Sequence, residues 1–409
     1  MSPLRQASLL EVNEFLVLDY VRDHGRTTRA SIAADLSLSS ASVSRIVKRL
    51  LQEGVVIESA GTTSPIPGRP PSAIEFNRSR GTIVAIDLGG TKCHGALADL
   101  GGAILRETVR PTDSSGDPYS TLLSTIGSLS GDATGMDMPV AAVAIGIPAM
   151  LDPDTGFALA GPNVQWLGFP LADRLKQDLD VPFTIDNDAN LAALGHAWRG
   201  QSKSVPNFAA IVLGMGIGAA IVLNGRLIRG QHNAAGEVGF LVLNREQLHQ
   251  PQDGRKGALE QLASGPAIGR RAHDLLAQYP DSTLGRSGEI TAENVFAAAK
   301  ASDPLALSVL DELIDHVAMA IIAIVSTVDP DLVILEGDVG RALNPYIDTI
   351  SRRVADRVPA PPRIVISSLQ SNATLLGAIA AGLELARQGS VPSVLFESFG
   401  FDMGIRHAR

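Results

Sequence analysis

The chain has 409 residues, of which 45% are hydrophobic and 19% are charged. This composition excludes a largely disordered protein, and the length predicts two to three domains. The longest apolar run, 317–325, has about half the length of a membrane span. Because the N-terminus also lacks the layout of a signal peptide, we expect a cytoplasmic protein without a membrane partner. A single cysteine, Cys93, excludes an intrachain disulfide and a cysteine-based zinc site.

Charge is unevenly distributed along the chain. Residues 1–80 contain ten Lys and Arg against eight Asp and Glu, a net charge of +2. The whole chain carries −9, so the remainder carries −11. A mildly basic head on an acidic body is typical of a protein whose head approaches nucleic-acid phosphates.

The first 52 residues show the pattern of three helices. Apolar residues at near-helical spacing predict a first helix that begins near Leu9 and ends by Gly25. Thr28 is placed to cap a second helix over 29–36. Residues 37–39 then predict a turn into a third helix that begins near Ser40.

The third helix has separate apolar and polar faces, as a DNA-recognition helix does. Five apolar residues between Val43 and Leu51 form one stripe, which leaves short hydroxyls and cations on the other faces. Such a helix packs its stripe on the domain core and turns its polar side toward the major groove. The residues of this helix that we expect at the DNA are Ser40, Ser42, Ser44, Arg45 and Arg49.

Two β-rich runs follow, at 55–58 and 73–76, separated by a Gly/Pro/Ser-rich segment that contains Gly68, Arg69 and Pro70. An interdomain linker is the alternative interpretation of this segment. A linker needs no strand-like runs on both sides, whereas a wing hairpin does, so the pattern favours a wing. Arg69 would lie at its tip and reach the minor groove or the phosphates. Residues 1–80 are therefore predicted to form a winged helix-turn-helix DNA-binding domain.

The run 83–92 combines a buried strand with a glycine turn. The strand reaches Asp87, and Gly89 and Gly90 allow the backbone to turn tightly and to point N–H groups at a phosphate. A plain β-hairpin turn is the alternative, and these residues alone leave both interpretations open.

Several motifs, taken in order, resemble the ROK family of repressors, ORFs and sugar kinases. They are the helix-turn-helix, GRP at 68–70, DLGGT at 87–91, NDAN at 187–190 and GEVG at 236–239. The resemblance covers nearly the whole chain and implies a homodimer or homotetramer. It implies an α/β fold in which the winged helix-turn-helix precedes an actin-like, ribonuclease-H-like ATPase (sugar kinase) fold of two lobes around a cleft. The first lobe would span 81–192, completed by a C-terminal helix at about 373–389, and the second would span 193–372.

The resemblance also implies roles for single residues. Asp188 matches the general base that takes a proton from the attacking sugar hydroxyl, although the helix dipole alone also favours an acid at a helix N-terminus. The matches to sugar-binding residues are Asn163, Asn187, Asp188, Glu237 and Glu260. For Asn163 an ordinary turn residue is the alternative. The matches to phosphate- and nucleotide-binding residues are Asp87, Gly89, Gly90, Thr91, Lys92, Gly214 and Gly216.

The chain departs from the family pattern at the zinc site. Family members usually hold Zn2+ with one histidine and three cysteines, and the residues at these positions here are Phe240, Pro251, Asp253 and Ala258. One carboxylate cannot build a tetrahedral site, so we expect no zinc and no other metal. Phe240 also replaces a polar contact to the sugar with an apolar face, which makes a glucose-type ligand less expected.

Two further departures concern ATP. Met215 stands where the kinases carry a threonine hydroxyl, and Glu336 stands at the nucleotide-side turn, where the family usually has two glycines. Losing one hydroxyl contact costs about 0.5–1.5 kcal/mol, and a carboxylate in a phosphate-binding cleft adds like-charge repulsion. Asp87 and Asp188 are intact. We therefore expect a sensor that requires no cofactor and has no efficient kinase activity, with Mg-ATP needed only if the chain is an active kinase.

Together these patterns predict a repressor of carbohydrate-metabolism genes. It would bind an inverted-repeat operator as a homo-oligomer, and a sugar in the cleft would modulate its operator affinity. One alternative is a bifunctional or plain ATP-dependent sugar kinase. Another is a regulator whose sugar site is dead and which a protein partner controls.

Overall fold

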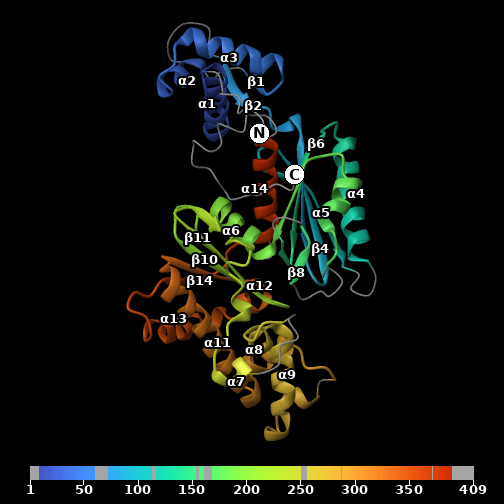
Figure 1. Ribbon diagram of the computed structural model, residues 1–409, viewed down its shortest axis with the longest axis vertical. Coiled ribbons are helices and arrows are strands. Elements are labelled where there is room, and N and C mark those ends of the chain that lie inside the picture. Colours follow the sequence, from blue (N-terminus) through green and yellow to red (C-terminus); the bar gives the residue numbers. More distant parts are fainter. Residues whose placement is uncertain are drawn as a thin grey trace.

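A small N-terminal head stands at one end of a larger body (Figure 1). The computed structural model describes residues 9–59, 72–112, 117–152, 156–160, 168–249, 256–286, 288–370 and 372–388. The head consists of α1 (Leu9–His24), α2 (Arg29–Asp35), α3 (Ser40–Gln52), β1 (Val56–Ser59) and β2 (Ala73–Phe76). This arrangement confirms the predicted winged helix-turn-helix fold.

The helices of the head begin and end where the sequence predicts. Gly25 terminates α1 with a φ of +64°, a conformation that costs glycine little. The Thr28 hydroxyl accepts the Ser31 N–H at 3.1 Å and caps α2. Ser39 caps α3 in the same way, because its hydroxyl accepts the Ser42 N–H at 3.1 Å. The apolar stripe of α3 then packs into the core of the head.

The two strands of the head pair as a wing. β1 runs antiparallel to β2, with Val56 opposite Phe76 and Ser59 opposite Ala73. This pairing confirms that the segment between them connects two strands of one hairpin. Arg69 lies outside the described residues, so its place at the wing tip stays a prediction.

The body contains two five-stranded sheets. The first has the strand order β5-β4-β3-β6-β9. Its strands are β3 (Thr82–Leu88), β4 (Lys92–Asp99), β5 (Ile104–Pro111), β6 (Val140–Ile147) and β9 (Phe183–Asn187), preceded by the short helix η1 (Arg78–Arg80). Associated with it are α4 (Pro118–Gly135), β7 (Met150–Leu151), β8 (Ala158–Ala160) and α5 (Leu171–Asp178).

The second sheet has the order β12-β11-β10-β13-β14. Its strands are β10 (Phe208–Leu213), β11 (Ile217–Leu223), β12 (Arg226–Ile228), β13 (Leu332–Glu336) and β14 (Arg363–Ile366). The helices are α6 (Asp188–Arg199), α7 (Arg245–His249), α8 (Glu260–Ala263), α9 (Gly265–Leu275), α10 (Ala292–Lys300), α11 (Pro304–Val328), α12 (Gly337–Ala342), α13 (Ile347–Ala355) and α14 (Ala373–Gln388). Short turns of 3-10 helix are η3 (Val238–Phe240), η4 (Leu276–Gln278), η5 (Thr283–Arg286) and η6 (Asn344–Tyr346).

The two sheets repeat one topology. In each, a central strand (β3 or β10) pairs antiparallel with the strand that follows it and parallel with a later strand (β6 or β13). The duplicated α/β arrangement confirms the predicted actin-like fold class. Within the part of the chain that the structure describes, no helix is long and apolar enough to cross a membrane.

Helices α6 and α14 form the joint between the two sheets. They pack on each other, and α14 also packs on β3 and β6. Two glycines bring the helix backbones together: a Cβ on Gly377 would lie 1.7 Å from the Leu191 carbonyl oxygen, and one on Gly195 would lie 2.2 Å from that of Ala373. The C-terminal helix is thus fixed against the helix that begins at Asp188.

We expect Gly377→Ala to lower the free energy of unfolding by about 1–3 kcal/mol, because the added methyl group overlaps the Leu191 carbonyl and forces the helices apart. Gly127→Ala is the matched control, since Gly127 lies inside α4 with no atom within 4 Å of an added Cβ. There the same substitution is expected to stabilise by up to about 1 kcal/mol. Denaturant unfolding measures both values, and equal effects would contradict the close approach of the two helices.

Candidate functional site

The junction between β9 and α6 carries Asn187 and Asp188. The Asn187 side chain caps the helix by accepting the Ala189 N–H at 2.8 Å, and its amide group donates to the Ala149 carbonyl at 3.3 Å. The Asp188 carboxylate accepts the same Ala189 N–H at 2.8 Å. Asp188 is therefore the first residue of a helix and also a rigidly supported carboxylate, so the structure is compatible with both roles considered for it.

Asp186, just before this junction, forms a buried ion pair that sequence reasoning missed. It is 8% exposed, and Arg229 binds it through both guanidinium nitrogens at 2.6 and 2.8 Å. The Asn187 N–H and the Asn190 side chain donate to the same carboxylate at 2.8 and 2.9 Å. Since Arg229 directly follows β12 of the other sheet, the pair ties the two lobes together beneath Asp188. An acidic residue inside an otherwise apolar strand was the available signal.

Glu237 lies in a loop whose backbone requires glycine. The preceding Gly236 has a φ of +90°, and a Cβ on it would lie 1.9 Å from the Ala219 carbonyl oxygen. A side chain at position 236 would therefore push the loop away from β11. The glycine lets Glu237 approach the cleft closely enough to interact electrostatically with Asp188 and Glu260.

Glu260, the first residue of α8, has one bonded and one unbonded carboxylate oxygen. Its Oε2 accepts the Ile217 N–H at 3.2 Å, whereas its Oε1 is buried and has no hydrogen-bond partner. Asn233 is similar, because its amide group donates to the Leu151 carbonyl at 3.1 Å while its buried oxygen has no partner. A buried acceptor without a donor is costly. Both side chains therefore offer an acceptor to a hydroxylated ligand.

Four carboxyl groups of this region have raised pKa values, mainly because of burial. Burial, followed by the nearby charge of Asp188, raises the pKa of Asp87 to about 7. Burial also raises the pKa of Asp188 to about 6. Burial and then the charges of Asp188 and Glu260 raise the pKa of Glu237 to about 7, and burial raises the pKa of Glu260 as well. This region is thus rich in hydrogen-bond acceptors.

The glycine turn after Asp87 is a β-hairpin turn. The Gly89 N–H donates to the Lys92 carbonyl at 2.9 Å, and the Thr112 hydroxyl donates to the Gly89 carbonyl at 2.9 Å. The side chains of Thr91 and Lys92 are exposed, and a Cβ on Gly90 would meet no atom within 4 Å. The turn is open enough to accept a phosphate, so the hairpin and phosphate-loop interpretations are compatible.

A second glycine turn joins β10 to β11. The Gly214 N–H donates to the Gly216 carbonyl at 3.0 Å, and the Gly214 carbonyl accepts the Gly265 N–H at 2.8 Å. Met215, between the two glycines, is 55% exposed. The apolar side chain therefore projects from the turn at the position where a hydroxyl was expected in the kinases.

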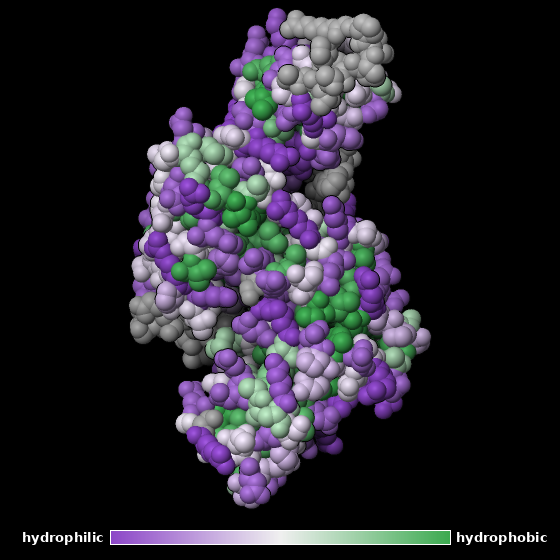
Figure 2. All heavy atoms as spheres, turned by 180° about the vertical axis from the view of Figure 1, so that it is seen from behind, coloured by the Kyte–Doolittle hydropathy of each residue, from purple (hydrophilic) through white to green (hydrophobic). Residues whose placement is uncertain are grey.

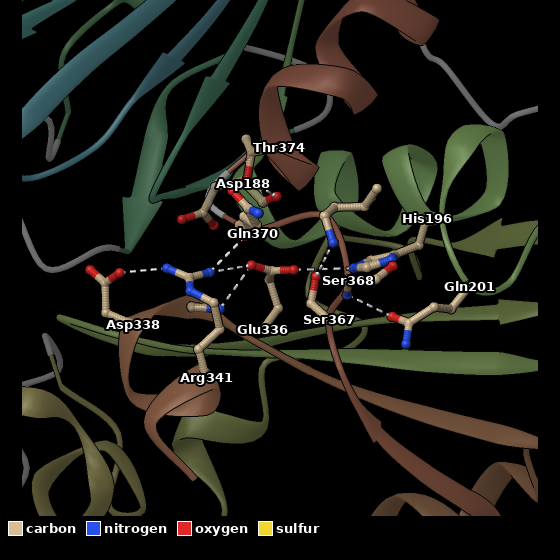
Figure 3. Close-up of polar contacts among 12 residues, drawn as sticks. Asp188, His196, Gln201, Glu336, Asp338, Arg341, Ser367, Ser368, Gln370 and Thr374 are labelled. Carbon is tan, nitrogen blue, oxygen red and sulfur yellow. Dashed lines mark hydrogen bonds and ion pairs between the residues drawn. The ribbon is translucent and has the colours of Figure 1, made fainter. Parts of the chain in front are cut away.

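Glu336, at the end of β13, is buried in a polar network (Figure 3). Its Oε1 accepts from the Arg341 guanidinium at 2.8 Å and from the Gly337 N–H at 3.1 Å, and its Oε2 lies 3.2 Å from the His196 Nε2. Burial alone would raise the pKa of Glu336, but hydrogen bonds from His196, Ser367 and Gly337 outweigh it and lower the pKa.

This network gives Glu336 a cationic partner that its expected effect on phosphate did not include. Sequence reasoning predicted a carboxylate whose charge repels a triphosphate. Arg341 pairs with Glu336, but its guanidinium also pairs with Asp338 and donates to the Gln370 carbonyl at 2.7 Å, so one cation faces two carboxylates. The end of β13 therefore carries an internal ion-pair cluster, and the residue that sequence reasoning missed is Arg341.

On the side of α3 that is predicted to face DNA, some side chains are exposed and others bond within the head. Ser40, Ser44 and Arg45 are exposed. Ser42 is half-buried, and its hydroxyl accepts from the Ser39 hydroxyl at 2.9 Å. Arg45 has no ion-pair partner among the described residues, so its guanidinium can reach a base edge or a phosphate without first breaking a contact.

Arg49 differs from Arg45 because it is bound inside the head. Its guanidinium pairs with Glu14 of α1 at 3.0 Å and with Glu53 at 2.9 Å. These bonds brace α3 against α1, and a DNA contact by Arg49 would compete with them. Asn163, predicted at the sugar, lies outside the described residues, so its role stays a prediction.

The residues at the family's zinc positions do not fit a zinc ion. Phe240 is 41% exposed, and Ala258 is buried with no ligand atom. In the part of the chain that the structure describes, no three His, Cys, Asp or Glu residues lie where they could hold a metal ion. Pro251 and Asp253 are outside that part, and the absence of zinc stays a prediction.

Comparison with known proteins assigns the family. Residues 83–384 match the model of the ROK family, and residues 10–57 match that of the winged helix-turn-helix DNA-binding family. Because the first match covers most of the chain, the protein belongs to the ROK family.

Relatives include both kinases and repressors. The glucokinase of Halalkalibacterium halodurans is 31% identical over 307 residues, which cover 72% of this chain and 92% of the kinase. The xylose repressor of Caldicellulosiruptor bescii is 27% identical over 382 residues, which cover 91% of this chain and 95% of the repressor. The crystal structure of a ROK family transcriptional regulator, a homologue of the E. coli MLC protein, superposes with a TM-score of 0.76 and 24% identity, covering 92% of this chain and 97% of that one. The repressor match includes the head, whereas the kinase match covers a smaller share of the chain.

The raised carboxyl pKa values predict a pH-dependent stability. An unfolded Glu237 ionises near 4.5 and the folded one near 7, so the folded state binds an extra proton between these pH values and loses stability as pH rises through them. We expect Glu237→Gln, which carries no charge to bury, to exceed the unmodified protein in free energy of unfolding at pH 8 by about 1–3 kcal/mol and to match it near pH 4.5. Denaturant unfolding at both pH values measures this difference, with the exposed Glu289→Gln as a control that should show none.

Proposed function

We propose that this protein is a sugar-responsive transcriptional repressor of carbohydrate-metabolism genes. The observation that carries the proposal is the unbonded, buried Oε1 of Glu260 beside Glu237 and Asp188, in a body fused to a winged helix-turn-helix head. The full-length similarity to a xylose repressor supports it. No zinc or other cofactor is part of this proposal.

A sugar suits the acceptor-rich cleft for a physical reason. Each sugar hydroxyl can donate one hydrogen bond, and ionised or buried carboxyl oxygens are strong acceptors for it. We propose that Asp188, Glu237 and Glu260 supply carboxyl oxygens to the sugar, that Asn187 supplies its amide group, and that Asn163 is a further contact. Phe240, exposed beside Glu237, offers an apolar surface to a sugar face.

The head supports operator binding through α3. A recognition helix reads one half-site, and a symmetric dimer reads two, so we propose an inverted-repeat operator bound by a homodimer or homotetramer. Arg45, Ser40 and Ser44 are exposed to reach base edges, and Arg69 would contact the minor groove or phosphates from the wing.

The proposal requires that sugar binding weakens operator binding and that operator binding weakens sugar binding. We expect a bound monosaccharide to lower operator affinity by about 5- to 150-fold, and the operator to lower sugar affinity by the same factor. The sugar is taken from a calorimetric panel that includes D-xylose and D-glucose, and the DNA is a duplex that the protein selects from random sequences. Fluorescence anisotropy then measures operator binding with and without sugar.

Two variants separate the sugar and DNA sites in this measurement. Glu237→Gln should weaken sugar binding by about tenfold or more through the loss of a charged acceptor and keep operator affinity. Arg45→Ala should weaken operator binding by about tenfold or more and keep sugar affinity. A sugar that binds fully while operator affinity stays unchanged would contradict the repressor proposal, and the absence of any bound sugar would favour control by a protein partner.

An ATP-dependent sugar kinase is the second candidate. Its specific support is the proximity of Asp188 and Asp87, whose charges interact, next to two open glycine turns. Asp188, with a pKa near 6, has the proton affinity of a general base at neutral pH. Against this candidate, phosphoryl transfer is mostly positioning and charge stabilisation, and Met215 and Glu336 stand at motif positions where the family's kinases carry a threonine and a glycine.

For the unmodified protein we expect turnover far below the about 1–100 per second of ordinary kinases. A coupled ADP-release assay with Mg-ATP and the same sugar panel measures it. Met215→Thr tests whether one hydroxyl restores activity, and Asp188→Asn controls for contaminating kinases. Sugar-dependent turnover at kinase rates that disappears in Asp188→Asn would make the kinase candidate correct.

A further inference from the structure

Helix α14 has one end at the cleft. The Thr374 hydroxyl, in its first turn, donates to the Asp188 backbone carbonyl at 3.3 Å, and Figure 3 shows the two residues side by side. The Thr374 methyl group also lies against Gly146 at the end of β6, where an added Cβ would approach it to 2.9 Å. If the β9–α6 junction shifts, its contacts with Thr374 therefore push or pull the start of α14.

The sides of α14 leave it little freedom to absorb such a displacement. Gly377 and Gly195 bring its backbone against α6, and Gly382 lies against Ile83 of β3, whose Cγ2 would be 2.3 Å from an added Cβ. The helix is 16 residues long, which corresponds to about 24 Å. Backbone contacts of this closeness make α6, β3 and α14 move together, because close-packed elements transmit strain instead of deforming continuously.

The other end of α14 reaches the DNA-binding head, and in Figure 1 the helix extends from the middle of the body toward it. Arg387 pairs with Asp19 at 3.3 Å and Asp23 at 3.9 Å, both on α1, and with Glu384 of its own helix at 3.7 Å. Burial, followed by the like charge of Arg387, lowers the pKa of Arg22 on α1 to about 10. Hydrophilic side chains gather on the surface where the head meets the body (Figure 2).

Space around this contact leaves the head room to move. A cavity of about 1360 Å³ lies between head and body and is lined by residues that include Leu18, Arg22, Leu100, Trp198 and Arg387. Next to the cavity, Leu100 of the body packs against the core of the head, and η1 joins β2 of the head to β3 of the body. With a cavity in place of a continuous packed interface, the Arg387 cluster can set the tilt of α1 and thus the direction in which α3 faces.

We infer that α14 is the element that couples the sugar cleft to the head, with the pairing of Arg387 to Asp19 and Asp23 as its contact on the DNA-binding side. This inference rests on the proposed function. A sugar bound in the cleft shifts Asp188, and α14 transmits this shift along its axis. The charged cluster around Arg387 then reorients α1. The coupling factor, defined as the ratio of operator Kd with saturating sugar to that without, reports it directly.

The test breaks the contact at the head and then restores it with opposite charges. In the full chain, Arg387→Glu is expected to reduce the coupling factor at least about threefold while sugar Kd changes less than about twofold, since the cluster does not touch the ligand. Combining Arg387→Glu with Asp19→Arg should return the coupling factor toward its unmodified value. Arg363→Glu is the control: it makes the same charge change at an exposed residue of β14 and should leave the coupling factor unaltered.

A second variant tests the cleft end without altering charge. Thr374→Val keeps the side-chain shape and the methyl contact but removes the hydroxyl that bonds the Asp188 carbonyl. It is expected to lower the coupling factor while operator affinity without sugar stays unchanged. If Arg387→Glu and Thr374→Val both lower the coupling factor, the coupling is assigned to the whole of α14.

The outcomes separate this inference from the function on which it rests. If sugar leaves the operator affinity of the unmodified protein unchanged, the repressor proposal and the inference both fail. If the unmodified protein responds and Arg387→Glu and Thr374→Val respond equally well, only the role of α14 is overturned. If Arg387→Glu loses coupling and the reversed pair does not regain it, the pairing with Asp19 is not the contact.

Discussion

The architecture depends on the close approach of α6 and α14. Their backbones meet at Gly195 and Gly377, where neither position has room for a methyl group. This contact fixes the C-terminal helix against the first sheet and places the start of α6, with Asp188, at the joint between the lobes. Asp188 therefore begins a helix whose position is held by close backbone contacts instead of by flexible side chains.

Charge compensation divides the cleft into two unlike halves. At the end of β13, Glu336 is buried beside Arg341, so a cation of the protein pairs with it. Among the described residues neither Glu237 nor Glu260 forms an ion pair, although the charge of Lys256 acts on Glu260, and burial raises the pKa of both. An internally balanced half has little to gain from a charged ligand, whereas an acceptor-rich half without donors gains from a neutral ligand that brings hydroxyl groups. This contrast favours sugar binding over nucleotide binding on electrostatic grounds.

Local sequence signals were reliable where the physics is local. Capping hydroxyls, helix-terminating Gly25 and the strand runs of the wing predicted the head, because caps and hairpins depend on neighbouring residues. The fold of the body followed from motif order. The partners of buried charges could not be predicted: Arg229 is 43 residues from Asp186, and His196 is 140 residues from Glu336. The repulsion expected from Glu336 was therefore judged without its partners: only the fold brings His196 to it, whereas Arg341 lies five residues along the chain and was overlooked.

The repeated strand order of the two sheets gives the cleft an approximate internal twofold relation. The turn after β3, with Gly89 and Gly90, and the turn after β10, with Gly214 and Gly216, occupy equivalent places in the two halves. Equivalent loops encoded by separate stretches of chain can diverge independently. The first turn presents bare backbone at Gly90, whereas the second exposes the apolar Met215 side chain, so the two equivalent turns offer different surfaces to whatever enters between the lobes.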